Sequence, residues 1–193
     1  MHKNRVSQNL VLASMSPRRR EMLAGVGLDF DIDPAHIDES LKPGESPEAA
    51  ARRLAAAKAR EVSRRHPTNI VLAADTLVCL GEYAMGKPAS HEEAVAMLQK
   101  LSGRTHRVIT GVCLRRRKPA LDETWSSITL VRFKKLDEEI IDRYMTLVKV
   151  MDKAGAYAIQ EHGGMLVDTI DGLESNVIGL PIEEVLERLA RLM

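Results

Sequence analysis

Residues Ile70–Leu80 read IVLAADTLVCL, and this stretch decides the fold. Apart from Asp75 and Thr76, every side chain in it is apolar. Such a run is typical of a strand that is buried on both faces of a sheet, as in α/β proteins with helices on each side. The stretch therefore predicts a central strand. It also makes Asp75 conspicuous, because an ionised carboxylate inside such a strand needs a partner.

On both sides of this strand, short apolar runs alternate with longer segments of helical period, which predicts an α/β fold. Further strands are expected at residues 9–13, 29–33, 108–114 and 125–133. Helices are expected at residues 17–24, 47–65, 91–101, 138–148 and 181–192, the first four each preceded by a Ser or Asp that can cap the first turn. Loops are expected at residues 33–45, 81–88 and 153–170, the last with short strands.

The composition is that of an ordinary globular protein. Of 193 residues, 45% are hydrophobic and 28% are charged, which excludes collagen-like and disordered classes. The length fits a single domain, residues 1–193, or two intimate lobes. The 28 basic and 27 acidic residues leave a net charge of +1, and aromatic residues make up only 3%. Both values argue against binding of a nucleic acid polymer, which requires a basic surplus or stacking aromatics.

The sequence also argues against a membrane protein. The longest apolar run is interrupted by Asp75 and is shorter than the ~20 residues of a membrane-spanning helix. The apolar residues 10–13 are too few for the core of a signal peptide. Cys79 and Cys113 have no His or Cys at metal-ligand spacing, which predicts buried free thiols. We therefore expect a cytoplasmic protein.

Three consecutive arginines, Arg18 to Arg20, follow Ser16 and Pro17 at the start of an expected helix. Positive charges there oppose the helix macrodipole, whose N-terminal end is already positive. An anion would reverse this effect, because the free amide groups, the hydroxyls of Ser14 and Ser16 and the guanidinium groups together form a phosphate cradle. The alternative is that the arginines extend into water and that Ser16 is only a cap.

Asp75 is expected to be paired, bound to a metal, or placed at the cleft end of its strand, where ligands bind in open α/β sheets. A hydrogen-bonding Asp that only closes the strand is the alternative. Lys58 among alanines, Lys87 in a loop and Glu39 in a polar loop are weaker candidates, and each could be solvated. Gln160 ends a run of small residues, and its amide supplies both the donor and the acceptor that reading a base edge requires. That run could equally be a structural turn.

Residues 115–118, Arg-Arg-Arg-Lys, form the densest block of charge. They connect two expected strands and precede Pro119, which predicts a solvated hairpin tip rather than a binding site.

Six short motifs, taken together and in this order, resemble the Maf family of nucleoside triphosphate pyrophosphatases along nearly the whole chain. They are ASMSPRR at residues 13–19, ADT at 74–76, GKP at 86–88, LSGRTH at 101–106, DKAGAYAIQ at 152–160 and VIGLP at 177–181. Each motif is modestly specific, and six in the family's order are very specific. Two segments depart from the family pattern, Glu161-His162 after the fifth motif and residues 172–175 before the sixth, and both are expected near the base-recognition side.

The resemblance implies a two-lobed α/β fold, with a mixed twisted sheet flanked by helices around a central cleft, similar to the inosine-triphosphate pyrophosphatases. Members of the family hydrolyse nucleoside triphosphates between the α and β phosphates, are commonly dimeric and depend on a divalent metal cation, Mg²⁺ or Mn²⁺. The form of residues 152–160 resembles the branch that acts on dTTP and UTP. The alternative role is that of a nucleotide-binding regulator of septum formation or cell division, which would not need the paired acids.

By resemblance, Asp75 is the catalytic proton acceptor and, with Glu39, a metal ligand. The residues implied in substrate binding are Ser14, Arg18, Arg19, Lys58, Thr76, Lys87 and Gln160. Of these, Arg18, Thr76 and Gln160 match positions associated with substrate choice. General chemistry fits these roles, because cations neutralise phosphate oxygens while carboxylates hold a divalent cation and accept the proton of an attacking water.

Overall fold

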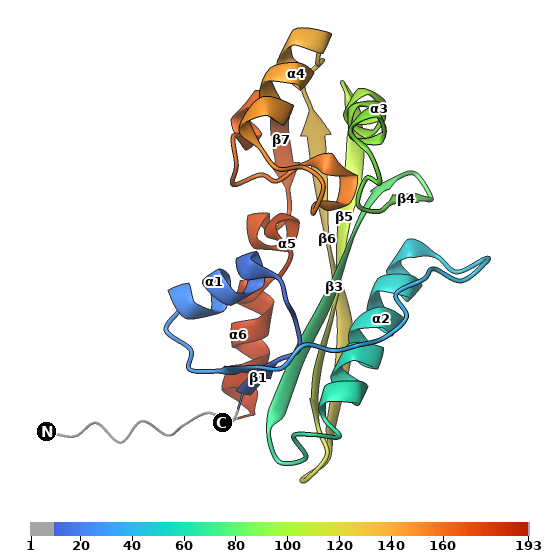
Figure 1. Cartoon of the computed structure of the whole chain (residues 1–193). Helices are drawn as coiled ribbons and strands as arrows, with labels where there is room; N and C mark the ends of the chain where they lie inside the picture. Colours follow the sequence, from blue (N-terminus) through green and yellow to red (C-terminus); the bar gives the residue numbers. More distant parts are fainter. Residues whose placement is uncertain (1–9, 193) are drawn as a thin grey trace, which may run out of the picture.

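Residues 10–192 are described by a computed structural model, in which one seven-stranded mixed sheet runs through the molecule (Figure 1). The strands are β1 (Leu10–Leu12), β2 (Asp31–Ile32), β3 (Ile70–Leu80), β4 (Tyr83–Met85), β5 (Thr105–Arg116), β6 (Leu121–Phe133) and β7 (Val167–Asp171). Their order is β2-β1-β3-β5-β6-β7, with β4 paired to β3. The short strand β1 is parallel to β2 and β3, whereas the other pairs are antiparallel. The expected mixed sheet is confirmed.

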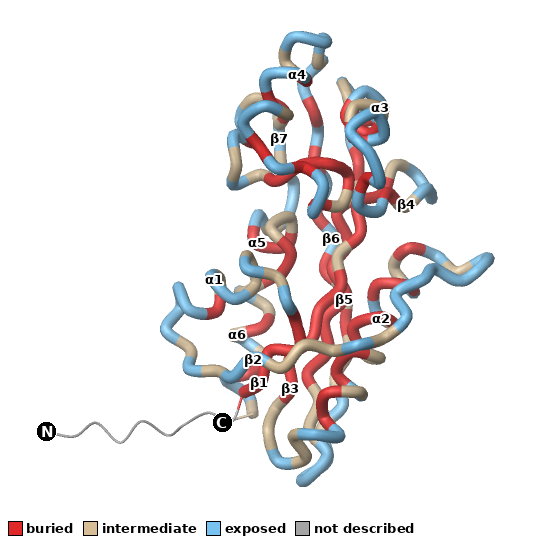
Figure 2. Tube along the Cα trace, viewed as in Figure 1, coloured by how far each residue is buried: buried red, intermediate tan, exposed pale blue. Residues whose placement is uncertain are grey.

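Three long strands, β3, β5 and β6, form a spine that both halves of the molecule share (Figure 1). Each half has its own hydrophobic core. The upper core gathers around Leu98, Phe133 and Tyr144, and the lower one includes Leu72 and Leu189. Figure 2 shows that the buried residues follow the spine while the outer helices and loops are exposed. The molecule therefore has two lobes on one continuous sheet, as expected.

In the lower lobe, helices cover both faces of the sheet. Helices α1 (Pro17–Gly25) and α6 (Ile182–Arg191) pack on one face, where they meet Leu72 and Ala74 of β3. Helix α2 (Pro47–Val62) packs on the other face, against residues 71 and 73 of the same strand. Because successive side chains along a strand point to opposite faces of the sheet, residues 75 and 76 also lie on opposite faces. Asp75 therefore points toward α2, and Thr76 points toward α1.

The upper lobe is built from the later part of the chain. Its elements are β4, β7, α3 (His91–Leu101), α4 (Glu138–Leu147) and the 3₁₀ turns η1 (Ala154–Ala156) and η2 (Gly163–Met165). A short helix, α5 (Glu174–Ile178), connects this lobe to α6. In Figure 1, α5 lies between the two lobes, beside the spine.

The helix starts follow the capping residues of the sequence. The side chains of Ser16, Ser46, Ser90 and Asp137 each accept a hydrogen bond from the amide three residues later, so that α1 to α4 begin where expected. In α3 the carboxylate of Glu93 accepts from the Ala89 amide at 2.7 Å, one residue before the position that a standard capping box uses.

Several boundaries differ from expectation. Residues 83–85 form β4 instead of a loop, because Gly81 adopts φ +61° and turns the chain back onto β3. Helix α2 ends at Val62 rather than at Arg65. Strands β5 and β6 are longer than predicted, because their polar outer residues remain paired in the ladder. Helix α5 was not expected, and residue 9 of the first predicted strand lies outside the described residues.

Cys79 and Cys113 are free and buried, as predicted, and burial raises the pKa of each thiol to about 11. Across residues 10–192, no helix combines the length and the apolarity that crossing a membrane requires.

Candidate active site

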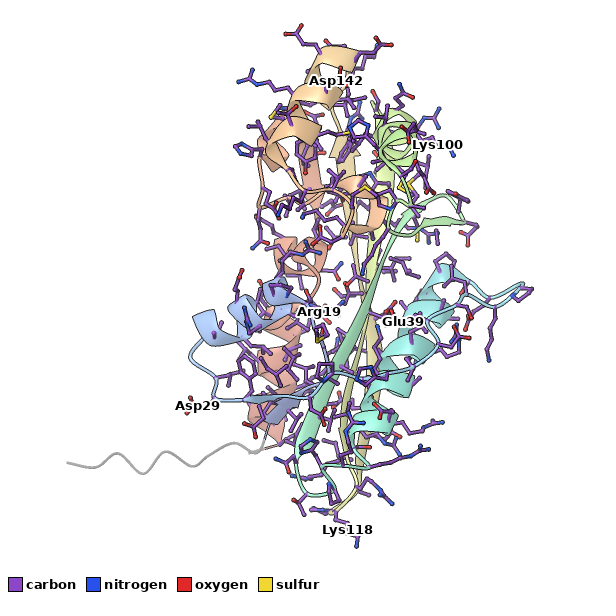
Figure 3. The ribbon with its side chains drawn as sticks, viewed as in Figure 1. Arg19, Asp29, Glu39, Lys100, Lys118 and Asp142 are labelled. Atoms are coloured by element: carbon purple, nitrogen blue, oxygen red, sulfur yellow. The ribbon has the colours of Figure 1, made fainter. Side chains whose placement is uncertain are left out.

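A cavity of about 360 Å³ opens between the lobes, beside the spine. Its lining includes every residue that the sequence and the family resemblance select: Ser14, Arg18, Arg19, Glu39, Lys58, Asp75, Thr76, Lys87 and Gln160. These side chains come from β3, from α1 and α2 and from loops that are far apart in the sequence. Figure 3 shows Arg19 and Glu39 on either side of β3.

The cavity exists because β1 is short. Strand β1 pairs with β3 only from Leu10 to Leu12, and the amide of Ala13 makes one further bond to the Leu72 carbonyl at 2.8 Å. Beyond that point the chain turns away through Ser14 into α1, while β3 continues as far as Leu80. The edge of β3 is therefore left open beside Asp75 and Thr76, and both faces of the strand contribute to one cavity.

Asp75 is in the middle of β3 and is paired with a lysine, so the paired placement expected for it is confirmed and the placement at the end of its own strand is wrong. The cleft lies instead at the carboxyl end of the neighbouring parallel strand, β1. Positions beyond the carboxyl ends of parallel strands are where open α/β sheets commonly bind ligands. The sequence does not reveal this, because the strand order is set by tertiary pairing.

The Asp75 carboxylate is paired with Lys58. Oδ1 of Asp75 accepts a hydrogen bond from Nζ of Lys58 at 2.6 Å, and the two residues are only 6% and 7% exposed. The same ammonium group lies 3.0 Å from Oε2 of Glu39, whose side chain is 56% exposed. One buried cation therefore links a buried carboxylate to a carboxylate at the mouth of the cavity.

A glycine brings this pair together. Gly111 of β5 lies opposite Asp75 in the sheet register, and a Cβ atom built on it would be 2.2 Å from the Ala51 carbonyl oxygen of α2. Only glycine therefore permits α2 to approach the sheet so closely. Lys58 follows Ala51 by about two helical turns on the same helix, and it reaches the Asp75 carboxylate directly.

On the opposite face of β3, the side chain of Arg19 is held by three partners. Its guanidinium donates to the Gly179 carbonyl at 2.8 Å, to Oγ1 of Thr76 at 2.9 Å and to Oγ of Ser14 at 3.2 Å. The Thr76 hydroxyl also lies 3.0 Å from that of Thr110. Burial lowers the pKa of Arg19, but guanidinium stays charged at any physiological pH. Arg19 is therefore a fixed positive charge at the bottom of the cavity.

The three arginines of α1 have separate environments. Arg18 lines the cavity and lies 3.9 Å from the Asp152 carboxylate of the opposite wall. Arg19 is held by its three hydrogen-bond partners. Arg20 is exposed and does not line the cavity. Of the residues predicted to form a phosphate cradle, Ser14, Ser16, Arg18 and Arg19 line the cavity and Arg20 does not.

Lys87 and Gln160 form the upper rim of the cavity. Both are exposed, and within residues 10–192 neither side chain has a hydrogen bond or ion pair. The Gln160 segment is nevertheless held in place. Gly155, with φ +67°, lies so close to Val78 of β3 that a Cβ atom would be 2.8 Å from its Cγ1. A side chain larger than hydrogen would separate this segment from the spine.

Two buried hydroxyl groups also anchor this segment. The hydroxyl of Tyr144 on α4 accepts from the Ala158 amide at 3.0 Å and donates to its carbonyl at 3.2 Å. The hydroxyl of Tyr157 lies 2.8 Å from Nε2 of His106 on β5. The free side chain of Gln160 therefore extends from a backbone that is held in place.

The two departures from the family pattern do not line the cavity. Glu161 instead pairs with the buried Lys153, at 3.2 Å, and His162 adopts a left-handed conformation before η2. Leu173 precedes α5, where its carbonyl accepts from Thr129 at 2.9 Å. Both segments therefore support the surroundings of the cavity, and because Glu161 directly follows Gln160, their position near the base-recognition side stays a prediction.

Sequence reasoning also missed some contributors. In the sequence, Asp152 is only the first residue of a family motif, yet it lines the cavity. Thr110 and the Gly179 carbonyl fix Thr76 and Arg19 from distant positions in the chain. The only sequence signal was that residues 177–181 form a family motif, and nothing in it indicated a partner.

Fold and cavity together define a mixed α/β protein with a cleft suited to an anionic ligand. The chain belongs to the Maf family, because the family model described as Maf-like protein matches residues 9–192.

Relatives are similar over nearly their whole length. A protein of Myxococcus xanthus is 50% identical over 182 residues, covering 94% of this chain and 91% of the relative. One of Akkermansia muciniphila is 46% identical over 180 residues, covering 93% of this chain and 94% of the relative. Both are named dTTP/UTP pyrophosphatase. Among solved structures, the Staphylococcus aureus Ham1 protein is 14% identical with a TM-score of 0.46, covering 64% of this chain and 71% of that one.

Proposed function

We propose that this protein hydrolyses nucleoside triphosphates, foremost dTTP and UTP and modified pyrimidine nucleotides, to a monophosphate and pyrophosphate, and so removes unwanted nucleotides. The observation that carries the proposal is the convergence of Asp75, Glu39 and Lys58 beneath a cationic rim in one cleft. The names of the relatives support the substrates.

The cations of the cleft have distinct roles in this proposal. A triphosphate carries several negative charges, which repel an attacking water unless they are neutralised. Arg18 and Lys87 line the cavity without strong internal ion pairs, so they are available to bind phosphate oxygens. Arg19 is rigidly held by its three partners and contributes a preorganised charge, which requires no rearrangement during the reaction. Ser14, whose hydroxyl contacts Arg19, completes this side of the phosphate site.

Asp75 is proposed to accept the proton of the attacking water. The water oxygen forms a bond to the α-phosphorus, while the bond between that phosphorus and the oxygen bridging to the β-phosphate breaks. Pyrophosphate leaves with the bridging oxygen and the electron pair of the broken bond. Lys58 holds the Asp75 carboxylate in position to receive this proton.

The donor set fits a divalent cation. Carboxylate oxygens of Glu39 and Asp75 both lie within 3.0 Å of one atom, Nζ of Lys58, so two hard oxygen ligands already converge. Within residues 10–192, no group of three or more His, Cys, Asp or Glu side chains is arranged to hold a metal. We therefore propose that Glu39 and Asp75 hold Mg²⁺ or Mn²⁺ together with substrate oxygens and water. When bound, the cation would neutralise charge on the phosphates.

Gln160 is proposed to read the base. The amide of Gln160 offers a donor and an acceptor side by side, and the N3–H and O4 groups of uracil and thymine present the complementary pair. Its free position on the rim supports this role. Thr76 is bonded to Arg19 and Thr110, so we propose that its effect on substrate choice acts through the position of Arg19.

A pyrophosphate-release assay tests the proposal. Purified protein is supplied with Mg²⁺ or Mn²⁺ and with each canonical triphosphate and a set of modified ones. We expect metal-dependent release, fastest from dTTP, UTP or their modified forms. Binding of these nucleotides without release of pyrophosphate would contradict the enzymatic proposal and favour a binding-only regulator.

Three further properties complete the proposal. The chain is proposed to act as a single domain, because the two lobes share β3, β5 and β6. The family resemblance supports a homodimer, and we propose a cytoplasmic location. Light scattering measures whether the protein is a homodimer, and cell fractionation measures its location.

A further inference from the structure

A second cationic pocket lies far from the cleft, at the end of the spine. It is lined by Arg60, Ser63, Arg64, Arg115 and Arg117, so four of its five lining residues are arginines. Arg60 lies in the last turn of α2, and Ser63 and Arg64 directly follow this helix. Arg115 lies at the end of β5, and Arg117 lies in the β5–β6 connection. In Figure 3, the neighbouring Lys118 marks this end of the molecule, remote from Arg19 and Glu39.

The sequence alone favoured a solvated hairpin tip for residues 115–118. The structure confirms this hairpin, with Arg117 and Lys118 exposed, and shows in addition that the tip is held in place. The amides of Arg117 and Lys118 both donate to the Pro67 carbonyl, at 3.2 and 2.8 Å. Pro67 follows α2 in the chain, so these bonds hold the tip against the end of that helix. Arginines from two distant parts of the sequence thereby converge.

The charges of this pocket are largely uncompensated. Arg115 pairs with Asp122 across the β5–β6 ladder. Within the described residues, the side chains of Arg60, Arg64 and Arg117 have no hydrogen bond or ion pair. These like charges repel one another, and nearby Glu61 and Asp33 are bonded to Arg65 instead. An anion bound between the arginines would relieve that repulsion.

The chemistry of the lining defines the class of anion. Each guanidinium group can bind two phosphate oxygens at once. Several guanidinium groups in one pocket therefore suit a ligand with more than one phosphate. No aromatic or apolar side chain lines the pocket, so a base would find no stacking partner there. We propose that this pocket is a second anion site, which binds a chain of two or more phosphates, either free or as the tail of a nucleotide.

The experiment compares three double variants by calorimetry with tripolyphosphate at low salt. In Arg64→Gln/Arg117→Gln, the second site loses two exposed charges and no internal bond. In Arg18→Gln/Lys87→Gln, the cleft loses two cations. Arg143→Gln/Lys149→Gln is the matched control, because it removes two exposed charges elsewhere.

We expect the wild-type protein to bind tripolyphosphate at the second site, with affinity reduced about tenfold or more in Arg64→Gln/Arg117→Gln, since each lost charge-assisted bond contributes at least that factor. The other two double variants should keep this binding event. Unchanged binding in Arg64→Gln/Arg117→Gln, an equal loss in the matched control, or disappearance of the event in the cleft variant would each overturn the proposal. Hydrolysis of the best substrate should be unaffected by Arg64→Gln/Arg117→Gln.

Two further titrations identify the ligand. If an α,β-methylene nucleoside triphosphate binds this site no more tightly than tripolyphosphate, the phosphate chain alone is recognised, and tighter binding assigns the same chemistry to a nucleotide tail. A single-stranded oligonucleotide that binds while tripolyphosphate does not would overturn the proposal in favour of a nucleic acid site.

Discussion

The ammonium group of Lys58 lies 2.6 Å from the carboxylate of Asp75, and both side chains are 9% exposed. Each charge is therefore the main compensation for the other in a nearly buried site. The pair connects α2 to the central strand and at the same time places the proposed base next to the cleft. Changes to the two residues should consequently separate catalysis from stability.

Asp75→Asn should remove hydrolysis and keep the fold. The amide oxygen of Asn can still accept from Lys58, but it is no longer a base for the attacking water. We expect turnover to fall by about 10²-fold to 10⁴-fold in a pyrophosphate-release assay. Asp122→Asn, a change to an acid far from the cleft, is the control and should retain activity. Near wild-type turnover in a folded Asp75→Asn protein would refute the proposed base.

Lys58→Met should destabilise the protein, because the carboxylate of Asp75 is left buried without its cation. Breaking a buried pair by removing one partner lowers the free energy of unfolding by about 3 kcal/mol. Urea denaturation at neutral pH measures this loss. Lys149→Met, at an exposed lysine whose side chain has no hydrogen bond or ion pair within the described residues, is the matched control, with an expected change near zero. The double variant Lys58→Met/Asp75→Leu should recover much of the stability, and failure to do so would assign the loss to packing.

Gln160→Ala should reduce discrimination among triphosphates more than it slows the best one. A site that hydrogen-bonds its ligand rejects mismatched groups strongly, because they remain buried and unpaired. The ratio of kcat/KM for UTP to that for CTP should fall by about tenfold or more. Gln99→Ala, on α3 and exposed, should leave this ratio unchanged. A uniform loss on all substrates would contradict a role in recognition.

Tyr144→Phe should loosen the segment that carries Gln160. The variant removes both hydrogen bonds to Ala158 but keeps the ring in the upper core. We expect KM for the best substrate to rise and the UTP to CTP ratio to shift in the same direction as in Gln160→Ala, with a smaller change in kcat. Tyr83→Phe, at an exposed tyrosine, is the control. A fall in stability with unchanged KM and selectivity would limit Tyr144 to a structural role.

Stability should decrease as the pH falls below about 6.5, in part because of His106. Burial lowers the pKa of His106 from 6.5 to about 4, so the unfolded chain binds a proton that the folded protein excludes. This group should reduce the free energy of unfolding by about 2 kcal/mol between pH 7 and pH 5. His106→Gln cannot be protonated, and it should be less sensitive to pH over this interval in urea denaturation. Equal sensitivity of the two proteins would show that His106 does not contribute.

Much of the fold was predictable because local signals set it. The apolar run of β3 gave its bounds without error, and Ser16, Ser46, Ser90 and Asp137 placed four helix starts. Strand β4 and helix α5 were missed. The first depends on pairing with β3, and the second is too short to show a helical period.

The site was predictable as a set of residues but not as an arrangement. The charge conflicts at Arg18 and Asp75, together with the family motifs, selected side chains that all line one cavity. The pairing of Lys58 with Asp75 depends on the approach of α2 at Gly111, and the fixed position of Arg19 depends on Gly179. Contacts between such distant positions follow from tertiary packing, which no local pattern encodes.

The continuity of the spine limits how the cleft can move. Enzymes that close around a ligand commonly rotate two bodies about a few loop residues that change their backbone angles. Here β3 and β5 are paired from Val71 to Cys79 and pass through both lobes, so rotation about a hinge would break the ladder. The width of the cleft therefore depends on the twist of the sheet, and we expect a ligand to be accommodated by small changes in that twist and by exposed side chains at the mouth, such as Glu39, Lys87 and Gln160. A ligand too large for the cleft should be rejected, because the two lobes cannot swing apart on a hinge.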